Sequence, residues 1–299
     1  MEQSRFLELH GQRMCLTDVG SGPPILFVHG LMSSRRTWSD QAVRLSTDHR
    51  VLAPDLFGHG ESAKPLGDYS LGAHAASLRD LLDALELDAV CVVGHSLGGG
   101  VAMQLAYLFP ARVERLVLVS SGGLGRELNP VLRAATLPGS EFVLPVLASG
   151  WVRGIGDSAL RVWSRSGLPA VSPSTTEAWG ALATLADGDT RRAFLATSRS
   201  VIDAGGQTVS ARNRLSGLTS RDVLLIWGAG DRMIPAAHVE AARAELPHSQ
   251  VAILPRSGHF PHLDEPDAFA AALAAFVRTP GEAVGRSAGD PEAPAVRPA

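Results

Sequence analysis

The chain has 299 residues, of which 45% are hydrophobic and 19% are charged. This balance is typical of an ordinary soluble globular protein, and the length suits one large α/β domain or two small ones. The formal net charge of −3 excludes the broad basic field that nucleic acids or an anionic membrane would require.

The sequence carries no pattern typical of export, a membrane span or a metal site. Residues 1–10 contain no apolar core of signal-peptide length, and the longest apolar run, residues 268–277, is too short to cross a bilayer. Two cysteines, Cys15 and Cys91, suit a reducing compartment, and neither CxxC nor HExxH is present. We therefore expect a cytoplasmic protein with no disulfide, no metal and no other cofactor.

Apolar runs of strand length alternate with helical patterns through the first 123 residues. In chain order they predict an edge hairpin (6–18), a strand (25–28), a helix (37–45), a strand (51–53), a helix (71–85), a strand (90–93), a helix (101–109) and a strand (113–119). Strands that alternate with helices form a parallel sheet covered on both faces. The sequence therefore predicts an α/β fold with a mostly parallel central sheet.

The alternation is interrupted between residues 124 and 218. This stretch has short helical patches separated by prolines and holds three of the five tryptophans, so we interpret it as a helical cap over the sheet. Strands at 223–227 and 251–254 and helices at 236–246 and 266–277 then resume the pattern. The predicted domains are a core (1–123 and 219–279), a cap insertion (124–218) and a disordered tail rich in Pro, Ala and Gly (280–299).

A sharp turn between a strand and a helix carries the strongest chemical signal. Residues 94–98 read Gly-His-Ser-Leu-Gly between the apolar run and the helical pattern. Such a turn strains its central residue and needs flanks without side chains, which Gly94 and Gly98 supply. It exposes the Ser96 hydroxyl and leaves the amide of Leu97 at the positive end of a helix. The turn predicts a nucleophile beside an anion site, although the motif alone also fits phosphate binding.

A nucleophilic serine needs a base, and the base needs an acceptor on its other nitrogen. Loops at the carboxyl ends of parallel strands converge on one crevice, so these partners are expected just after strands. Asp231 follows the strand that ends at Trp227, and His259 follows the strand that ends at Leu254. We therefore predict Ser96 as nucleophile, His259 as base and Asp231 as the acid that orients the base.

A second backbone donor for the anion site is expected after the strand 25–28. Gly30 permits a close turn there, and the amide of Leu31 is predicted to point at the same spot as that of Leu97. Two such donors each supply about 3 kcal/mol to a developing oxyanion. His29 is interpreted as shaping this turn, because another histidine already occupies the position of the base.

Residues 25–279 resemble the α/β-hydrolase superfamily. Five motifs carry the resemblance in the order of the superfamily: the His29-Gly30 turn, the loop from Pro54-Asp55 to Gly58-His59-Gly60, the Gly94 to Gly98 elbow, Gly230-Asp231 and Gly258-His259. The resemblance implies the α/β-hydrolase fold and acyl transfer through an acyl-enzyme, with no cofactor. Epoxide hydrolases and haloalkane dehalogenases of this fold carry aspartate at the elbow, so Ser96 argues against both.

The substrate class depends on the cap and on residues beside the triad. Candidate substrate-binding residues are Met32, His95, Trp151, Trp163 and Phe260, which together favour small to medium apolar esters or related acyl compounds. The alternative for the cap tryptophans is that they form the cap's own core.

Two further functions stay open from the sequence. Gly122-Gly123-Leu124-Gly125 is similar to a stretch in meta-cleavage product hydrolases, which break C–C bonds, and the cap arginines Arg191, Arg192 and Arg199 are candidates to meet a substrate carboxylate. His95 and Phe260 depart from that group, which tends to carry asparagine and tryptophan there. The third hypothesis is a non-catalytic ligand-binding protein on the same fold. The oligomeric state is not predicted.

Overall fold

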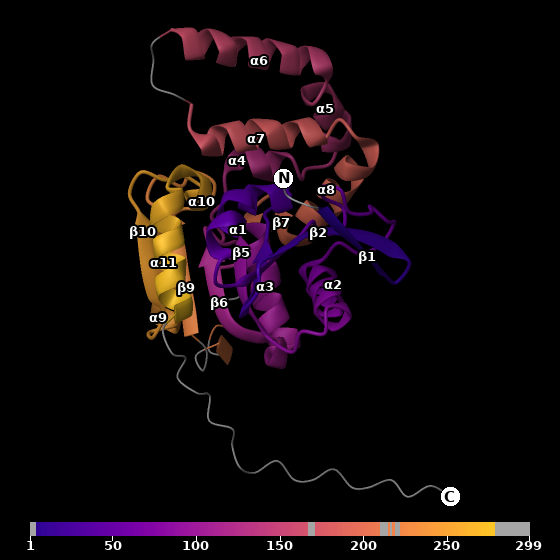
Figure 1. Cartoon of the computed structure of the whole chain (residues 1–299). Coiled ribbons are helices and arrows are strands. Elements are labelled where there is room, and N and C mark those ends of the chain that lie inside the picture. The colour runs from indigo at the N-terminus through magenta and orange to yellow at the C-terminus, as the bar shows by residue number, and fades with distance from the viewer. Residues whose placement is uncertain (1–3, 167–170, 210–214, 216, 219–221, 279–299) are drawn as a thin grey trace, which may run out of the picture.

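The computed structural model describes residues 4–166, 171–209, 215, 217–218 and 222–278 (Figure 1). In this part of the chain one sheet has eight strands in the order β1-β2-β4-β3-β5-β6-β9-β10. The strands are β1 (Ser4–Leu9), β2 (Gln12–Val19), β3 (Pro24–Val28), β4 (Arg50–Pro54), β5 (Val90–His95), β6 (Val113–Val119), β9 (Asp222–Gly228) and β10 (Gln250–Leu254). Within this sheet, as far as the structure describes it, only the pairs β1–β2 and β2–β4 are antiparallel. The predicted α/β fold with a mostly parallel sheet is confirmed.

Helices cover both faces of this sheet. One face packs against α2 (Leu71–Ala84), α3 (Leu97–Leu108) and α9 (Ala237–Glu245), and the other against α1 (Ser39–Leu45) and α11 (Pro266–Arg278). The buried strand β5 shows why both faces need cover: Val90 and Val92 join one hydrophobic cluster, whereas Cys91 and Val93 join the other. Short helical turns at Arg35–Trp38, Pro110–Arg112 and Pro261–Asp264 (α10) complete the core.

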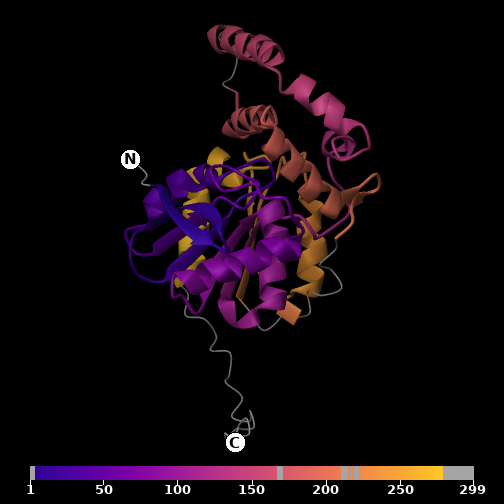
Figure 2. The same cartoon turned by 90° about the vertical axis from the view of Figure 1, so that its right-hand side faces the viewer.

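The segment between β6 and β9 is mainly helical and lies above one edge of the sheet (Figures 1 and 2). It contains α4 (Pro130–Ala134), α5 (Ser140–Leu147), α6 (Gly150–Arg165), α7 (Pro173–Thr184), α8 (Gly188–Val201) and the short strands β7 (Ile202–Asp203) and β8 (Gly206–Gln207). The β7–β8 hairpin was not expected from the sequence. In both views α6 is the outermost of these helices.

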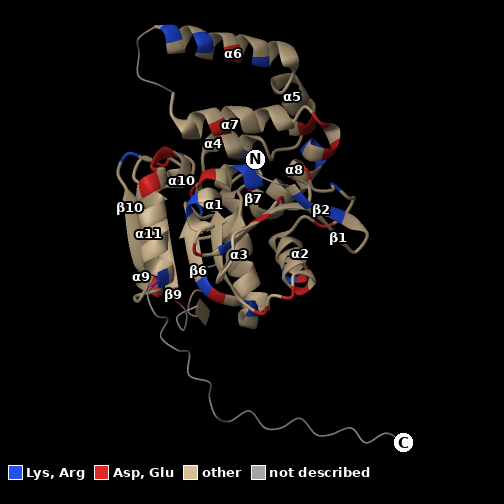
Figure 3. Cartoon of the chain, viewed as in Figure 1, with Lys and Arg blue, Asp and Glu red and all other residues tan. Residues whose placement is uncertain are grey.

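Residues of both charges are interspersed along the core and the segment between β6 and β9 (Figure 3). Among the helices of the described residues, none combines the length and the apolar character that crossing a bilayer requires. The tail predicted over residues 280–299 lies outside the described residues.

Candidate active site

Ser96 occupies a strained turn between β5 and α3. Its φ of 54° and ψ of −117° lie where residues with a side chain are rarely found. A Cβ atom on Gly94 would lie 2.3 Å from the Gly98 carbonyl oxygen, and one on Gly98 would lie 2.3 Å from the Val28 carbonyl oxygen. Both flanks must therefore be glycine, because backbone atoms occupy the space of a side chain.

Asp231 and His259 meet at the carboxyl ends of the neighbouring strands β9 and β10. His259 Nδ1 lies 2.9 Å from Asp231 Oδ2, and both residues are buried. The other carboxylate oxygen, Oδ1, accepts the backbone N–H groups of Met233 and Ile234 at 2.8 and 3.0 Å. Because an ionised carboxylate only accepts hydrogen bonds, the proton is on Nδ1 and Nε2 remains available as a base.

The Ser96 hydroxyl and His259 form no hydrogen bond with each other in the described part of the chain. Bonds of this kind are often long outside a substrate complex and tighten within it. Ser96, Asp231 and His259 all follow strands of the parallel part of the sheet at their carboxyl ends. The fold thus brings the three predicted residues to one edge of the sheet.

The backbone N–H groups of Leu31 and Leu97 border the same site. Leu97 is the first residue of α3, and both leucines line a pocket together with Ser96. Among the described residues neither N–H group donates a hydrogen bond. The backbone at Gly30 packs closely against Ser96, since a Cβ atom on Gly30 would lie 3.1 Å from Ser96 Cβ. This arrangement supplies two backbone donors near the serine.

His29 holds the turn that precedes Leu31. Its Nε2 accepts the Leu56 N–H at 3.0 Å, so Nδ1 carries the proton and donates to the Gly30 carbonyl oxygen at 2.8 Å. Burial lowers the pKa of His29 to about 4. The side chain is therefore a neutral structural residue, and both of its nitrogens are already hydrogen bonded.

His95 lies behind the base instead of at the pocket. Its Nε2 donates to the His259 carbonyl oxygen at 2.8 Å, and its ring lies 4.7 Å from the Phe260 ring and 4.9 Å from the His262 ring. Burial holds the pKa of His95 well below its usual range, so the ring is neutral. His262 stacks on Trp38 at 4.1 Å. These rings support the backbone that carries His259.

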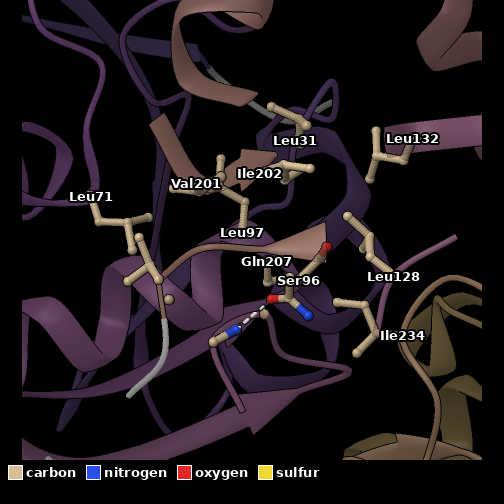
Figure 4. A pocket seen from close by; sticks show the side chains of 14 residues that line it. Leu31, Leu71, Ser96, Leu97, Leu128, Leu132, Val201, Ile202, Gln207 and Ile234 are labelled. Carbon is tan, nitrogen blue, oxygen red and sulfur yellow. Dashed lines mark hydrogen bonds between the residues drawn. The ribbon is translucent and has the colours of Figure 1, made fainter. Parts of the chain in front are cut away.

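An apolar pocket opens beside Ser96 (Figure 4). Its cavity has a volume of about 50 Å³. Its side-chain lining is aliphatic except for Ser96 and Gln207, and it comes from the core and the cap: Leu31, Leu71, Leu97, Leu128, Leu132, Val201, Ile202, Val209 and Ile234. The sequence reasoning missed Gln207 and the aliphatic wall. The turn-forming residues 203–206, Asp-Ala-Gly-Gly, are the signal that would have indicated the hairpin carrying Gln207.

The structure does not bring the other predicted substrate-binding residues to this pocket. Trp151 and Trp163 lie on α6 with exposed fractions of 67% and 44%. Met32 borders a separate polar cavity of about 570 Å³ near Arg35 and Glu61. Phe260 is partly buried against His95, outside the lining of the apolar pocket. The two tryptophans miss the pocket because α6 stands away from the core (Figure 1). Met32 and Phe260 are neighbours of Leu31 and His259 in the chain, but proximity in sequence did not direct their side chains to the pocket.

Two known proteins are similar to this chain over most of its length. The chain is 39% identical over 276 residues to an uncharacterized protein of Mycobacterium tuberculosis, covering 92% of this chain and 81% of that one. It is 25% identical over 277 residues to a 2-hydroxy-6-oxo-6-(2'-aminophenyl)hexa-2,4-dienoic acid hydrolase of Metapseudomonas resinovorans, covering 91% and 90% of the two chains.

A solved structure of an N-acyl homoserine lactone degrading enzyme superposes with a TM-score of 0.70 at 25% identity, covering 91% of this chain and all of that one. A model of the alpha/beta hydrolase family matches residues 25–272. The strained serine, the paired aspartate and histidine, and the parallel sheet that places them therefore identify the chain as a member of the alpha/beta hydrolase family.

Proposed function

We propose that this chain is a serine hydrolase that cleaves esters, or related acyl compounds, of small apolar acids. The main support for this proposal is the 2.9 Å contact between His259 Nδ1 and Asp231 Oδ2. It lies at the sheet edge where Ser96 occupies its strained turn. This contact fixes the tautomer that a serine needs from its base.

In the proposed reaction, His259 Nε2 takes the proton of Ser96 Oγ while that oxygen attacks the substrate carbonyl carbon. The N–H groups of Leu31 and Leu97 stabilise the resulting oxyanion. His259 then protonates the leaving alcohol as the acyl-enzyme forms. In the second half it takes a proton from water, which attacks the acyl carbon. His259 then gives this proton to Ser96 Oγ as the bond to the acyl carbon breaks, which releases the acid and restores the enzyme.

The size of the apolar pocket favours a short acyl group. Its volume is about 50 Å³, whereas an apolar cavity of roughly 150 Å³ is known to hold benzene. Acyl groups from acetyl to about butyryl match this space. A bulky aromatic acyl group would require the cap to move.

C–C bond cleavage receives less support from the described residues. Arg191 donates to the carbonyl oxygen of Leu185, Arg192 pairs with Asp189, and Arg199 pairs with Glu141. These cap arginines are engaged within the cap or at its base, and none lines the described apolar pocket. A carboxylate-bearing ring-fission product would therefore lack an arginine partner there.

The test is hydrolysis of p-nitrophenyl esters of increasing acyl length by the wild type, by Ser96→Ala and by Ser158→Ala. Ser158 is an exposed serine on α6, so its variant controls for the loss of a hydroxyl. We expect turnover to be highest for short acyl groups and to fall by several orders of magnitude only in Ser96→Ala. Absence of turnover by the wild type, with turnover of ring-fission products, would favour the C–C hydrolase. Binding of small ligands without any turnover would favour the non-catalytic alternative.

A further inference from the structure

Gln207 reaches the apolar pocket from the cap. It ends the β8 strand, is 7% exposed, and is the one side chain besides Ser96 with polar atoms among the described residues that line this pocket. Figure 4 shows its amide beside Ser96, within the ring of aliphatic side chains. A single polar group in an otherwise aliphatic wall is the feature that sets orientation and selectivity in small-molecule sites.

The orientation of this amide is determined by its partners. The Gly123 N–H donates to one amide atom at 2.7 Å, so that atom is the oxygen, Oε1. The other atom lies 3.2 Å from the Glu127 carbonyl oxygen, so it is the nitrogen, Nε2. The amide thus ties the cap hairpin to the Gly122-Gly123 turn, whose Gly122 N–H in turn donates to the Ser96 carbonyl oxygen at 2.9 Å.

Among the described residues, these bonds leave one N–H of Gln207 without a partner. Nε2 carries two hydrogens, and the Glu127 carbonyl oxygen takes one of them in the described part of the chain. A buried donor without a partner is costly, and in native structures it generally meets water or a ligand. The aliphatic side chains around it supply no acceptor, so an oxygen atom of a bound substrate is a partner that this N–H can meet in the pocket.

We propose that the second N–H of Gln207 donates to an oxygen atom within the acyl chain of the substrate. This inference rests on the proposed ester hydrolysis and narrows its substrate class to short acyl groups that carry a hydroxyl, keto or ether oxygen. Gln207 is then a specificity-determining residue. It stabilises a substrate with an oxygen in its acyl chain, whereas the mechanism by which Ser96 attacks the ester carbonyl stays the same.

The experiment compares p-nitrophenyl butyrate with the methoxyacetate, 3-hydroxybutyrate and 3-oxobutyrate esters. Methoxyacetyl has the size of butyryl, with one methylene replaced by an oxygen that accepts but does not donate a hydrogen bond. Each kcat/KM is divided by that of butyrate for the same enzyme. Comparing this ratio between the wild type and variants cancels the intrinsic reactivity of the esters.

Two variants distinguish recognition of the substrate by Gln207 from its structural contact with the Gly122-Gly123 turn. Gln207→Glu keeps an oxygen that accepts the Gly123 N–H but removes the donor, whereas Gln207→Met removes both. We expect at least one oxygenated ester to lose three- to tenfold relative to butyrate in both variants, which is the effect of one neutral hydrogen bond.

Equal losses for butyrate and for all three oxygenated esters would show that Gln207 only supports the turn, and would overturn the inference while leaving ester hydrolysis intact. If the wild type hydrolysed none of the four esters, the proposed function itself would fail, and the inference with it.

Discussion

His95 Nε2 donates a hydrogen bond to the carbonyl oxygen of His259 over 2.8 Å. The residue before the proposed nucleophile therefore holds the backbone of the proposed base. Because the acceptor is a carbonyl oxygen, Nε2 of His95 must carry the proton. The bond links the end of β5 to the loop that follows β10, and these two strands are not neighbours in the sheet.

His95 is thus expected to act as a positioning residue. His95→Phe keeps a ring but loses the donor, so kcat for a short ester should fall about tenfold while KM changes little. His95→Gln places an amide N–H near the position of Nε2 and should recover most of the loss. Steady-state kinetics on the two variants makes the comparison. An equal loss in both, accompanied by equal drops in thermal stability, would instead indicate a packing role.

Asp231→Asn should abolish most activity with little loss of stability. The side-chain oxygen of the introduced asparagine can still accept the N–H groups of Met233 and Ile234, whereas its NH₂ group would face His259 Nδ1. The imidazole would then carry its proton on Nε2, the wrong nitrogen for a base. We expect kcat to fall by roughly 10⁴. Asp231→Ala, which also loses the turn contacts, should lower the melting temperature in addition.

Stability should decrease as the pH falls below about 6.5. Burial lowers the pKa of His29 to about 4 and that of His59, His74 and His262 to about 3. These side chains are neutral in the folded state, so the unfolded state binds more protons between pH 3 and 6.5. Each group then costs up to about 1.4 kcal/mol of stability per pH unit within that window.

Urea unfolding between pH 4 and 8 measures this dependence. The free energy of unfolding should be level above pH 7 and should decrease steadily toward pH 4. His262→Phe should reduce the slope, and His248→Ala, at an exposed position, serves as the matched control. A profile that is level down to pH 4 would contradict the assignment of these histidines as neutral.

Gly98→Ala should destabilise the fold severely. The added Cβ would lie 2.3 Å from the Val28 carbonyl oxygen and 2.5 Å from that of His29, so β3 and α3 would have to separate. We expect a loss of more than about 4 kcal/mol in the free energy of unfolding. Gly154→Ala is the control, because no atom lies within 4 Å of its Cβ position in α6. That variant should gain up to about 1 kcal/mol through helix propensity.

The acyl-length preference should respond to Leu132 and not to Trp151. Leu132 lines the apolar pocket, whereas Trp151 is 67% exposed on α6. Leu132→Trp should fill the pocket and shift the preference toward acetyl esters, because a pocket of about 50 Å³ has no room for both an indole and a butyryl chain. Trp151→Ser should leave the preference unchanged. A shift in Trp151→Ser would show that α6 closes over the substrate.

Most of the core elements, and the positions of the three proposed catalytic residues at the ends of strands, could be predicted because their signals are local. Runs such as residues 90–93 are apolar throughout because both faces of the strand are buried, and an elbow needs glycine at fixed distances from its serine. The end of a strand marks the sheet edge where Asp231 and His259 lie. Each of these patterns can be read from a short stretch of sequence, although the contacts that require them, such as that of Gly98 with the Val28 carbonyl oxygen, form only in the folded chain.

The lining of the apolar pocket beside Ser96 was decided by the tertiary structure alone. Trp151 and Trp163 are large aromatic residues of the kind that line ligand sites, yet α6 leaves them exposed. The pocket beside Ser96 is instead lined by residues such as Leu128, Leu132 and Gln207. Gln207 meets Gly123 only because a two-stranded hairpin returns the cap to the core. Contacts between segments so far apart in the chain depend on packing that no local pattern encodes. The sequence by itself therefore determined the family and the sheet-edge positions of the three proposed catalytic residues, and the tertiary structure decided which side chains line the pocket beside Ser96.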